Sequence, residues 1–478
     1  METRYLDALR IGLRPSVYFG AHVRPSSIED RMRRYGVPGV SITIIERGQV
    51  VVSEHYGVQH AHRTEPVTGG TLFQAASLSK LVTALATLRL VSQGVLSLDC
   101  DVNAYLSRWK LRGDCETWDG TVTLRRLLNH TAGVSVSYYP GYAPDQPLPS
   151  LEAVLNGVPP ALTAPVVVFR APGSALCYSE GGVLVEQLAL EDVRNQPLQE
   201  LVDELILRPL SIEASTFAQP LPTPLQGSAA AGHGLSGEGL QPPWRVYPEA
   251  AAAGLWTTSI DMAKLLLSIR RAVRGESSNL LSTPVANEMV TPTGLGSVNH
   301  DFGLGLWVAG ASNTFRYGHA GVHVGFRHLC MLFHETGSGA VVLTNGARGN
   351  HLIDEVFATL AEAGQWPGQT YRSCRKVPHR PSATALQKVC GEYRIVQRKP
   401  GALMSLPGTC VSISRTDDGL VMRSRVMCDE YFMAQTDTVF GSIDSWLGLR
   451  FELGEQERAT GLVVTSRSKD VAWAERVG

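Results

Sequence analysis

Ser77 and Lys80 form a Ser-x-x-Lys motif inside residues 73–86, where a long apolar segment begins. A spacing of three residues places both side chains on one face of a helix, one turn apart. A serine hydroxyl is a poor nucleophile until another group takes its proton. The partly positive N-terminus of the helix also lies where negative charge develops during attack on a carbonyl. The motif therefore predicts a serine that forms an acyl intermediate.

The same four-residue pattern occurs three more times, and the sequence context separates the copies. Ser107 has no helical pattern after it, and Ser373 lies in a basic, proline-containing segment. Ser466 lies in an alternating run that is typical of a strand or a turn. Only Ser77 follows an extended stretch and precedes a helical pattern that stops near Gly94. Ser77 is therefore the predicted nucleophile.

Tyr178 is the candidate for a second group that handles protons between the serine and the leaving group. It lies in residues 172–182, after a Pro-Gly break and before two glycines that permit close approach. A tyrosine acts as a general base only if its phenolate is stabilised, and the Lys80 ammonium would stabilise it. A tyrosine that only packs is the alternative, because the chain contains 14 tyrosines.

Residues 317–326 have the pattern of an edge strand that faces a site, with glycines that let a substrate approach. The backbone N–H of Val322 would pair with that of Ser77 as an oxyanion hole. Strand alternation places His319, Gly321 and His323 on one face. The sequence leaves open which histidine acts in the site.

Composition is that of a globular protein. The length of 478 residues suggests two domains, or one large domain with an appendage. A net charge of -1 and a pI near 6.9 give no electrostatic reason to expect binding to nucleic acid or to anionic membranes. Residues 1–10 have the character of neither a signal peptide nor an anchor, and no later segment is apolar enough to span a bilayer. We therefore expect no membrane partner.

The eight cysteines occur singly, without CxxC pairs. This distribution disfavours metal and redox motifs and favours reduced thiols in a cytosolic protein. We therefore expect a cytoplasmic protein that uses no metal and no cofactor. Cys177 lies beside Tyr178, but a buried packing thiol is the commoner case.

Hydrophobic periodicity predicts the elements that position these residues. Residues 25–36 predict a helix capped by Ser26 or Ser27, and residues 40–45 and 50–53 predict a hairpin. A helix follows Ser77 and stops near Gly94, and further helical patterns lie at residues 124–130, 182–190, 198–207, 260–273, 283–289 and 351–363. Strand-like runs lie at 302–310, 326–333 and 339–345. This order favours an antiparallel sheet whose first and last strands meet, with a helical region beside it.

Residues 135–172 are rich in Pro, Tyr and Ala and show little periodicity. A long irregular segment often forms a lid or a pocket wall, and a surface loop without function is the alternative. Tyr138, Tyr139 and Tyr142 suggest an apolar pocket mouth, or else simple packing.

The sequence changes character near Trp366. Residues 366–386 have the composition of a linker, and short alternating runs follow at 393–396, 411–414, 420–422, 447–453, 462–465 and 471–473. These runs predict a small all-β barrel. We therefore divide the chain into a catalytic domain (1–365), a linker (366–386) and a barrel domain (387–478).

Ser77-x-x-Lys80, Tyr178-Ser-Glu180 and His319-Ala-Gly321, in this order and spacing, resemble the serine β-lactamase and penicillin-binding-protein superfamily. The likeness is to its class C-like branch of esterases, D-aminopeptidases and related hydrolases, and it covers residues 25–365. Residues 127–133, 252–258 and 342–346 support it. The resemblance implies an α+β, β-lactamase/transpeptidase-like fold. The C-terminal segment is similar to the lipocalin-like barrel that some members carry.

The resemblance also implies roles for single residues. Ser77 would be the nucleophile, Lys80 and Tyr178 the proton-handling pair, and His319 a residue near the leaving group. The substrate would contact the residues around them, which are Glu180, Gly321, Val322 and His323.

Two departures from the family pattern bear on the substrate. Many members have an asparagine at the position of Glu180, where it binds the substrate amide. A carboxylate cannot offer that donor, so β-lactam recognition is not expected. His319 in place of a lysine weakens the expected contact with a β-lactam carboxylate, and it favours esters or other amides.

The leading hypothesis is a cytosolic serine hydrolase that cleaves an ester or an amide, in a small molecule or a peptide, through an acyl-Ser77 intermediate. The alternative is an acyltransferase or a peptide-cyclising thioesterase of the penicillin-binding-protein type. A binding or assembly protein without catalysis is disfavoured by the intact Ser77, Lys80 and Tyr178. The barrel could contact the site or mediate a homodimer.

Overall fold

The computed structural model of the chain describes most of its residues. The exceptions are residues 1, 16, 20–24, 114–120, 236, 277–279, 299, 369–373, 377–378, 399–409, 417–418, 425–429, 443–446, 456, 467–468 and 478. Everything below concerns the described residues.

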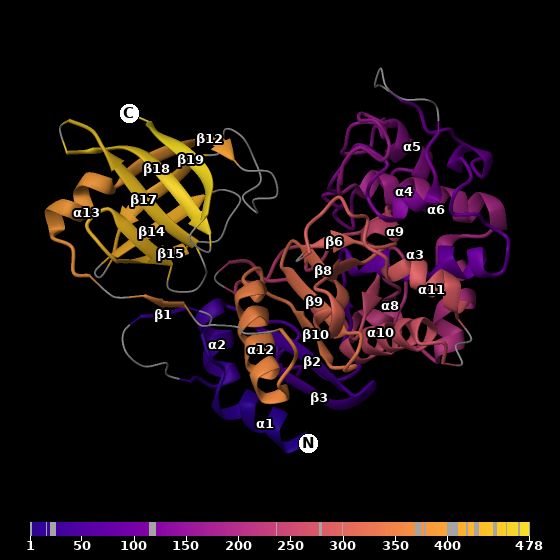
Figure 1. Cartoon of the computed structure of the whole chain (residues 1–478), viewed down its shortest axis with the longest axis horizontal. Coiled ribbons are helices and arrows are strands. Elements are labelled where there is room, and N and C mark those ends of the chain that lie inside the picture. The colour runs from indigo at the N-terminus through magenta and orange to yellow at the C-terminus, as the bar shows by residue number, and fades with distance from the viewer. Residues whose placement is uncertain are drawn as a thin grey trace.

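A seven-stranded antiparallel sheet forms the centre of the larger part of the molecule (Figure 1). Its order is β3 (Gln49–Gly57), β2 (Gly39–Glu46), β10 (Gly339–Thr344), β9 (Phe326–Phe333), β8 (Arg316–His323), β7 (Trp307–Ala309) and β6 (Asp301–Phe302). Strands β2 and β10 are neighbours, with Val40 opposite Thr344. The first long strand of the chain therefore meets the last long strand of this sheet, as the element order predicts, and the α+β fold is confirmed.

Helices α1 (Glu2–Ile11), α2 (Ile28–Tyr35) and α12 (Gly349–Gly364) share one apolar core with β2 and β10. Helix α2 begins at Ser27, whose side chain accepts a hydrogen bond from the Asp30 amide, and it ends at Gly36 with φ 59°. The cap and the stop are those that the sequence predicts. Trp366, at the start of the expected linker, is also buried in this core.

The second, larger core lies on the side of the sheet that α10 (Ser259–Val273) covers. It unites α10 with a helical region of α3 (Leu78–Ser92), α4 (Leu124–Leu128), α5 (Leu151–Asn156), α6 (Glu180–Arg194), α7 (Leu198–Val202), α9 (Ala250–Ala253) and α11 (Thr283–Val290). Helix α3 contacts α6, α7, α9 and α11. The helix that follows Ser77 is therefore enclosed by other helices rather than by solvent, and its side chains are mostly buried.

Strand β8 is not an edge strand along its whole length, which corrects one expectation from the sequence. Strand β7 pairs with residues 316–318 only, so the half from His319 to His323 has a strand partner on the β9 side alone among the described residues. The cause lies in the turn before β7. Gly305 has φ 76°, and a Cβ added to it would lie 2.1 Å from the Ala84 Cβ of α3. The chain is thus held against α3 there and pairs with β8 only after the turn.

The C-terminal part is a closed antiparallel barrel whose strands follow one another in chain order (Figure 1). The strands are β12 (Gly391–Arg398), β13 (Cys410–Arg415), β14 (Gly419–Ser424), β15 (Glu430–Ala434), β16 (Val439–Ser442), β17 (Leu447–Leu453), β18 (Ala459–Ser466) and β19 (Lys469–Val477). The predicted all-β barrel is present, although the sequence patterns missed β15 and β16. Its lipocalin-like identity stays a prediction.

The segment expected to be a linker carries regular structure. Strand β11 (Cys374–Lys376) pairs in parallel with β1 (Val17–Phe19), and α13 (Ala383–Val389) leads into the barrel. The division of the chain into domains stays a prediction. Over the described residues, no helix has both the length and the apolar character that crossing a membrane requires.

Candidate active site

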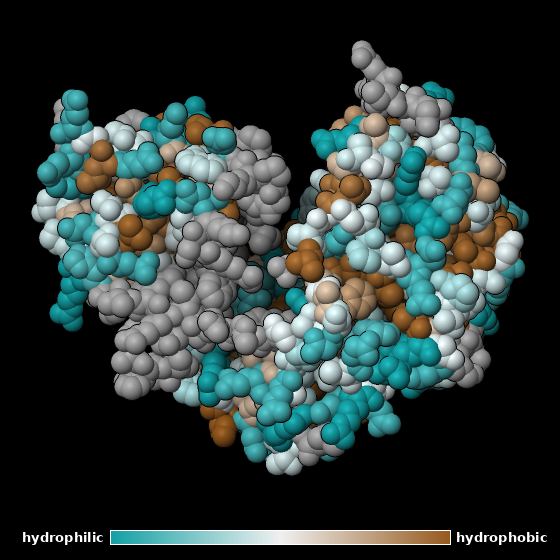
Figure 2. Space-filling model, viewed as in Figure 1, coloured by the Kyte–Doolittle hydropathy of each residue, from teal (hydrophilic) through white to brown (hydrophobic). Residues whose placement is uncertain are grey.

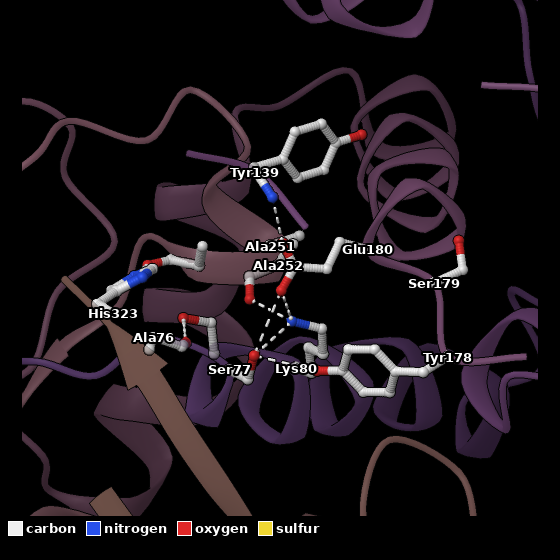
Figure 3. A network of polar contacts seen from close by, with 12 residues as sticks. Ala76, Ser77, Lys80, Tyr139, Tyr178, Ser179, Glu180, Ala251, Ala252 and His323 are labelled. Carbon is white, nitrogen blue, oxygen red and sulfur yellow. Dashed lines mark hydrogen bonds and ion pairs between the residues drawn. The ribbon is translucent and has the colours of Figure 1, made fainter. Parts of the chain in front are cut away.

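Ser77 lies at the N-terminus of α3, shortly after a short strand that positions the chain ahead of it. Strand β4 (Phe73–Gln74) pairs with β5 (Trp256–Thr257), and Ala76 then has φ 54°, which a non-glycine residue seldom adopts. Although Ser77 occupies the N-cap position, its side chain caps no helix amide. The hydroxyl is therefore directed at other side chains instead of the helix backbone (Figure 3).

Lys80 lies one turn into α3 and is only 1% exposed. Its Nζ donates to the Ser77 Oγ at 2.9 Å, the Glu180 Oε1 at 2.8 Å and the Ala252 carbonyl at 2.8 Å. An ammonium has three N–H groups, so all three are used. Burial lowers the pKa of Lys80, but Glu180 and Tyr178 raise it by more, and the net pKa is raised. Lys80 is therefore a charged ammonium.

Tyr178 approaches Ser77 from the residues just before α6. Its hydroxyl donates to the Ser77 Oγ at 3.0 Å, and the His130 ring packs against its own ring with centroids 4.4 Å apart. Burial raises the pKa of Tyr178, and the nearby Lys80 offsets this only in part. The neutral phenol is thus the favoured form. The phenolate, which a tyrosine general base requires, is disfavoured.

Glu180, expected to bind substrate, lies in the polar network around Ser77 (Figure 3). Its Oε1 accepts from Lys80 at 2.8 Å and from the Ser77 hydroxyl at 3.4 Å. Its Oε2 accepts from the backbone N–H of Tyr139 at 2.9 Å. The residue is 5% exposed, and the donors that hold its carboxylate come from two separate segments, α3 and the start of the 135–172 segment.

The start of the irregular segment 135–172 holds Glu180 in position. The Val136 carbonyl accepts from the amides of Glu180 and Gly181, each at 2.9 Å. A Cβ added to Gly181 would lie 2.5 Å from the Ser135 carbonyl oxygen, so a glycine is needed for this contact. The beginning of the segment therefore forms a wall of the site, as one of the two sequence interpretations proposed.

The three tyrosines of this segment divide into two groups. Tyr139 and Tyr142 are 0% and 2% exposed, so they pack in the interior. Tyr138 is 48% exposed and interacts electrostatically with Glu180, Arg245 and Arg327. Tyr138 is thus the tyrosine of this group that solvent or a substrate can reach.

The two histidines of β8 are buried beside the site and neutral. The His319 Nδ1 lies 2.7 Å from the Ala320 carbonyl, and the His323 Nε2 lies 3.0 Å from the Ala253 carbonyl. Burial lowers the pKa of each ring to about 3. His323 also stacks on Tyr247, with centroids 4.2 Å apart. His323 thus joins β8 to α9, and neither ring offers a positive charge at neutral pH.

Gly321 and Val322 lie beside the segment that leads to Ser77. A Cβ added to Gly321 would lie 2.5 Å from the Ala75 carbonyl oxygen, so β8 runs close to that segment. His323 pairs with Phe326 across a two-residue turn, and such a closing pair is hydrogen-bonded. The N–H of Val322 therefore points away from β9, toward the unpaired side of β8. Within the described chain, the Ser77 amide donates to no other group.

Of the other Ser-x-x-Lys copies, the structure describes the side-chain surroundings of one, Ser107 and Lys110. Lys110 donates to the carbonyl groups of Asn103 and Leu106. Ser373 lies outside the described residues, and Ser466 and Lys469 stand at the ends of β18 and β19. Among the described residues, no group of three or more His, Cys, Asp or Glu side chains is arranged to hold a metal ion.

Sequence reasoning did not assign roles to three groups that complete the site. They are the Ala252 carbonyl, the Tyr139 amide and the His130 ring, which contact Lys80, Glu180 and Tyr178 respectively. His130 and Ala252 lie in stretches that support the family resemblance, so a signal was present for them. Two of the three are backbone atoms, whose contribution does not depend on residue type.

Comparison with known proteins agrees with this fold. Residues 26–365 match the Beta-lactamase family. The match spans well over half of the chain, and the chain therefore belongs to the beta-lactamase family of serine hydrolases.

Individual relatives are distant. Protein flp of Staphylococcus aureus (strain MW2) is 26% identical over 192 residues, which cover 40% of this chain and 37% of that protein. Esterase EstB of Burkholderia gladioli is 27% identical over 274 residues, or 51% of this chain and 68% of that protein. The chain thus matches well under half the length of the first relative.

Solved structures share the fold at low identity. SurE with D-Leu has a TM-score of 0.56 and 22% identity, with 94% of this chain and 97% of that chain covered. The octameric penicillin-binding protein homologue from Pyrococcus abyssi has a TM-score of 0.57 and 21% identity, with 94% and 98% covered. The D-amino acid amidase from Ochrobactrum anthropi SV3 has a TM-score of 0.55 and 20% identity, with 70% and 97% covered.

Proposed function

We propose that this chain is a serine hydrolase that cleaves an ester or an amide through a covalent acyl-Ser77 intermediate. The observation that carries the proposal is the Ser77 hydroxyl. It caps no helix amide, and it is hydrogen-bonded to Lys80, Tyr178 and Glu180 at the N-terminus of a buried helix. A hydroxyl held among proton donors and an acceptor in this way has the surroundings that a serine nucleophile requires.

A serine hydrolase must also stabilise the oxyanion that forms during attack, and two backbone amides are the candidates for this role. We propose that the N–H groups of Ser77 and Val322 bind the carbonyl oxygen of the substrate as it becomes negative. The close approach of Gly321 to Ala75 supports this pairing, as does the outward direction of the Val322 amide. Such donors contribute about 3–4 kcal/mol each to lowering the barrier.

The surroundings of the site support an uncharged acyl group. His319 and His323 are neutral, and the Lys80 ammonium has no N–H left for a substrate. Apolar residues gather on the viewed face near β6 and β8 (Figure 2). The exposed large apolar side chains of that part of the chain include Leu295, Val298 and Val322. We therefore expect neutral esters or amides to be better substrates than β-lactams, whose carboxylate needs a cation.

A labelling experiment tests the proposal. A fluorophosphonate probe should modify the wild-type protein once, and Ser77→Ala should abolish the modification, as read by intact mass. Ser107→Ala is the matched control, because Ser107 begins another Ser-x-x-Lys copy and is exposed. Undiminished labelling of Ser77→Ala would contradict the proposal.

A substrate panel then defines the reaction. It holds p-nitrophenyl esters, D- and L-aminoacyl amides and a chromogenic cephalosporin, each with and without an added amine acceptor. EstCE1, a solved structure of the same fold, is described as a hydrolase with promiscuous acyltransferase activity. Free acid as the product supports hydrolysis, whereas an amide of the acceptor supports the acyl-transfer alternative.

A further inference from the structure

The hydrogen bonds at the Ser77 oxygen define where its proton points. A hydroxyl oxygen has one hydrogen to donate and two lone pairs to accept. The Lys80 ammonium has only N–H groups, so it donates to Ser77. The hydroxyl of the neutral Tyr178 donates to Ser77 as well. Both lone pairs are then occupied, and the remaining contact, 3.4 Å to the Glu180 Oε1, takes the Ser77 hydrogen.

We propose that Glu180 is the general base that removes the Ser77 proton, an inference that rests on the proposed function. Lys80 and Tyr178 then have other tasks. Lys80 holds the carboxylate in its orientation, and Tyr178 is a proton donor. Glu180 is thus a catalytic residue, instead of the substrate contact that the sequence suggests.

The ionisation states of the neighbours agree with this assignment. The pKa of Lys80 is raised, because Glu180 and Tyr178 outweigh the effect of burial, so the amine carries no free lone pair. Burial raises the pKa of Tyr178, so its oxygen keeps its proton. Neither group can accept a proton in the form that the site favours. The carboxylate of Glu180 is the acceptor that remains.

The distance fits a resting site. A separation of 3.4 Å is long for proton transfer, but such contacts are often long in a free enzyme and shorten when substrate binds. Lys80 and the Tyr139 amide hold the two oxygens of Glu180 in place. Ser77 is the partner that moves during attack, because its Oγ must approach the acyl carbon.

The acylation step balances in protons. As the bond from Ser77 Oγ to the acyl carbon forms, its proton passes to Glu180. The bond from the acyl carbon to the leaving group then breaks, and the leaving group takes the Tyr178 hydroxyl proton. Lys80 is hydrogen-bonded to Glu180 and also interacts with Tyr178. It returns a proton to Tyr178 and receives the one on Glu180, which restores the starting charges.

Several titratable groups face Glu180 from the elements packed around it. They are Lys80 on α3, Tyr178 before α6, Tyr138 and Tyr139 on the 135–172 segment, and Tyr247 and Glu249 before α9. Burial raises the pKa of Glu249 to about 7, so this group is itself partly protonated near neutral pH. The fall of the acylation rate at acid pH must therefore be assigned to a residue by substitution, because the pH at the midpoint of the fall does not identify the group.

The test compares acylation rates of Glu180→Gln and Glu180→Asp with the wild type over a range of pH, measured by the burst with a p-nitrophenyl ester. We expect Glu180→Gln to acylate about 10²–10⁴-fold more slowly and to lose the acid limb, in which the rate falls as the base is protonated. Glu180→Asp keeps a carboxylate, so it should retain the limb with a smaller loss.

Glu186→Gln is the matched control on the same helix. Glu186 is buried, its pKa is raised to about 8 by burial, and it accepts from Thr87 at 2.6 Å instead of from Ser77. Its acylation rate should equal that of the wild type. Thermal melting of each variant checks that it is folded.

Two outcomes overturn the inference alone, and a third overturns it together with the proposed function. In the first, Glu180→Gln acylates at the wild-type rate or keeps an unchanged acid limb, and Tyr178→Phe loses the limb. This result would assign the base to Tyr178. If Glu180→Gln does not fold, loss of the acid limb in Glu180→Asp would overturn it. A wild-type protein that forms no acyl-Ser77 contradicts the proposed function itself, and the assignment of Glu180 falls with it.

Discussion

Two buried clusters in this molecule are built from the same three kinds of side chain, a carboxylate, a cation and a tyrosine. One joins Glu180, Lys80 and Tyr178. The other joins Glu355 of α12 with Arg31 and Tyr35 of α2. The carboxylates are similarly buried, with side-chain exposures of 7% and 1%. Burial and charge pairing therefore do not distinguish the two clusters.

The difference is the position of the tyrosine. Tyr35 donates directly to the Glu355 carboxylate at 2.8 Å, and the Arg31 Nε donates to its other oxygen at 2.7 Å. In the site, Tyr178 donates to Ser77, which in turn donates to Glu180. The α2–α12 cluster joins two helices, whereas in the site a serine lies between tyrosine and carboxylate, on the path that we propose for the proton.

Breaking the α2–α12 cluster should affect stability and leave chemistry intact. Glu355→Ala removes the fully buried carboxylate of an ion pair whose Arg31 side chain is 12% exposed, so we expect the free energy of unfolding to fall by about 3–5 kcal/mol. Urea denaturation measures this loss, and the esterase rate per folded molecule should stay at the wild-type level. A rate that falls in the folded variant would erase the distinction between the clusters.

Matched substitutions of the two tyrosines sharpen the comparison. Tyr178→Phe removes the proton donor at Ser77, and we expect acylation to slow by about 10²-fold. Tyr35→Phe removes one hydrogen bond from a carboxylate, so we expect a loss of about 1–3 kcal/mol in stability and no change in rate. Burst kinetics and denaturation of both variants, side by side, test this. Equal rates in the two variants would argue against a catalytic Tyr178.

The approach of β8 to Ser77 can be disturbed by one methyl group. A Cβ at Gly321 would lie 2.5 Å from the Ala75 carbonyl oxygen, so Gly321→Ala must push β8 away from the nucleophile. We expect kcat to fall by about tenfold, because a small displacement weakens the Val322 donor. Gly227→Ala is the control, since nothing lies within 4 Å of a Cβ there. An unchanged kcat in Gly321→Ala would remove Val322 from the oxyanion hole.

A further effect concerns pH and stability. The pKa of His323 is about 3 in the folded protein, against an ordinary value of 6.5. The unfolded chain therefore binds more protons between these values, and stability falls as pH decreases through this window. His323→Gln removes the contribution of this histidine to the pH dependence of stability. The melting temperature of the variant should therefore depend less steeply on pH between 6.5 and 4. A slope equal to that of the wild type would contradict a buried neutral imidazole.

Local patterns of the sequence predicted much of the fold. The cap at Ser27, the stop at Gly36 and the helix after Ser77 depend on residues a few positions apart, and all three are present. The edge-strand prediction for residues 317–326 was wrong for the first half of β8. Pairing with β7 depends on how the turn at Gly305 packs against α3, and no local pattern reports that contact.

The sequence by itself indicated that Ser77, Lys80, Tyr178 and strand β8 meet at one site. Ser77 and Lys80 share a face because helix geometry puts them one turn apart, and the order of the three motifs implied that Tyr178 and β8 join them. Only the tertiary structure decided the charges. Whether Lys80 and Tyr178 hold a proton depends on their burial and on their interactions with each other and with Glu180. These groups come from distant parts of the chain, and their effect exists only once the chain is folded.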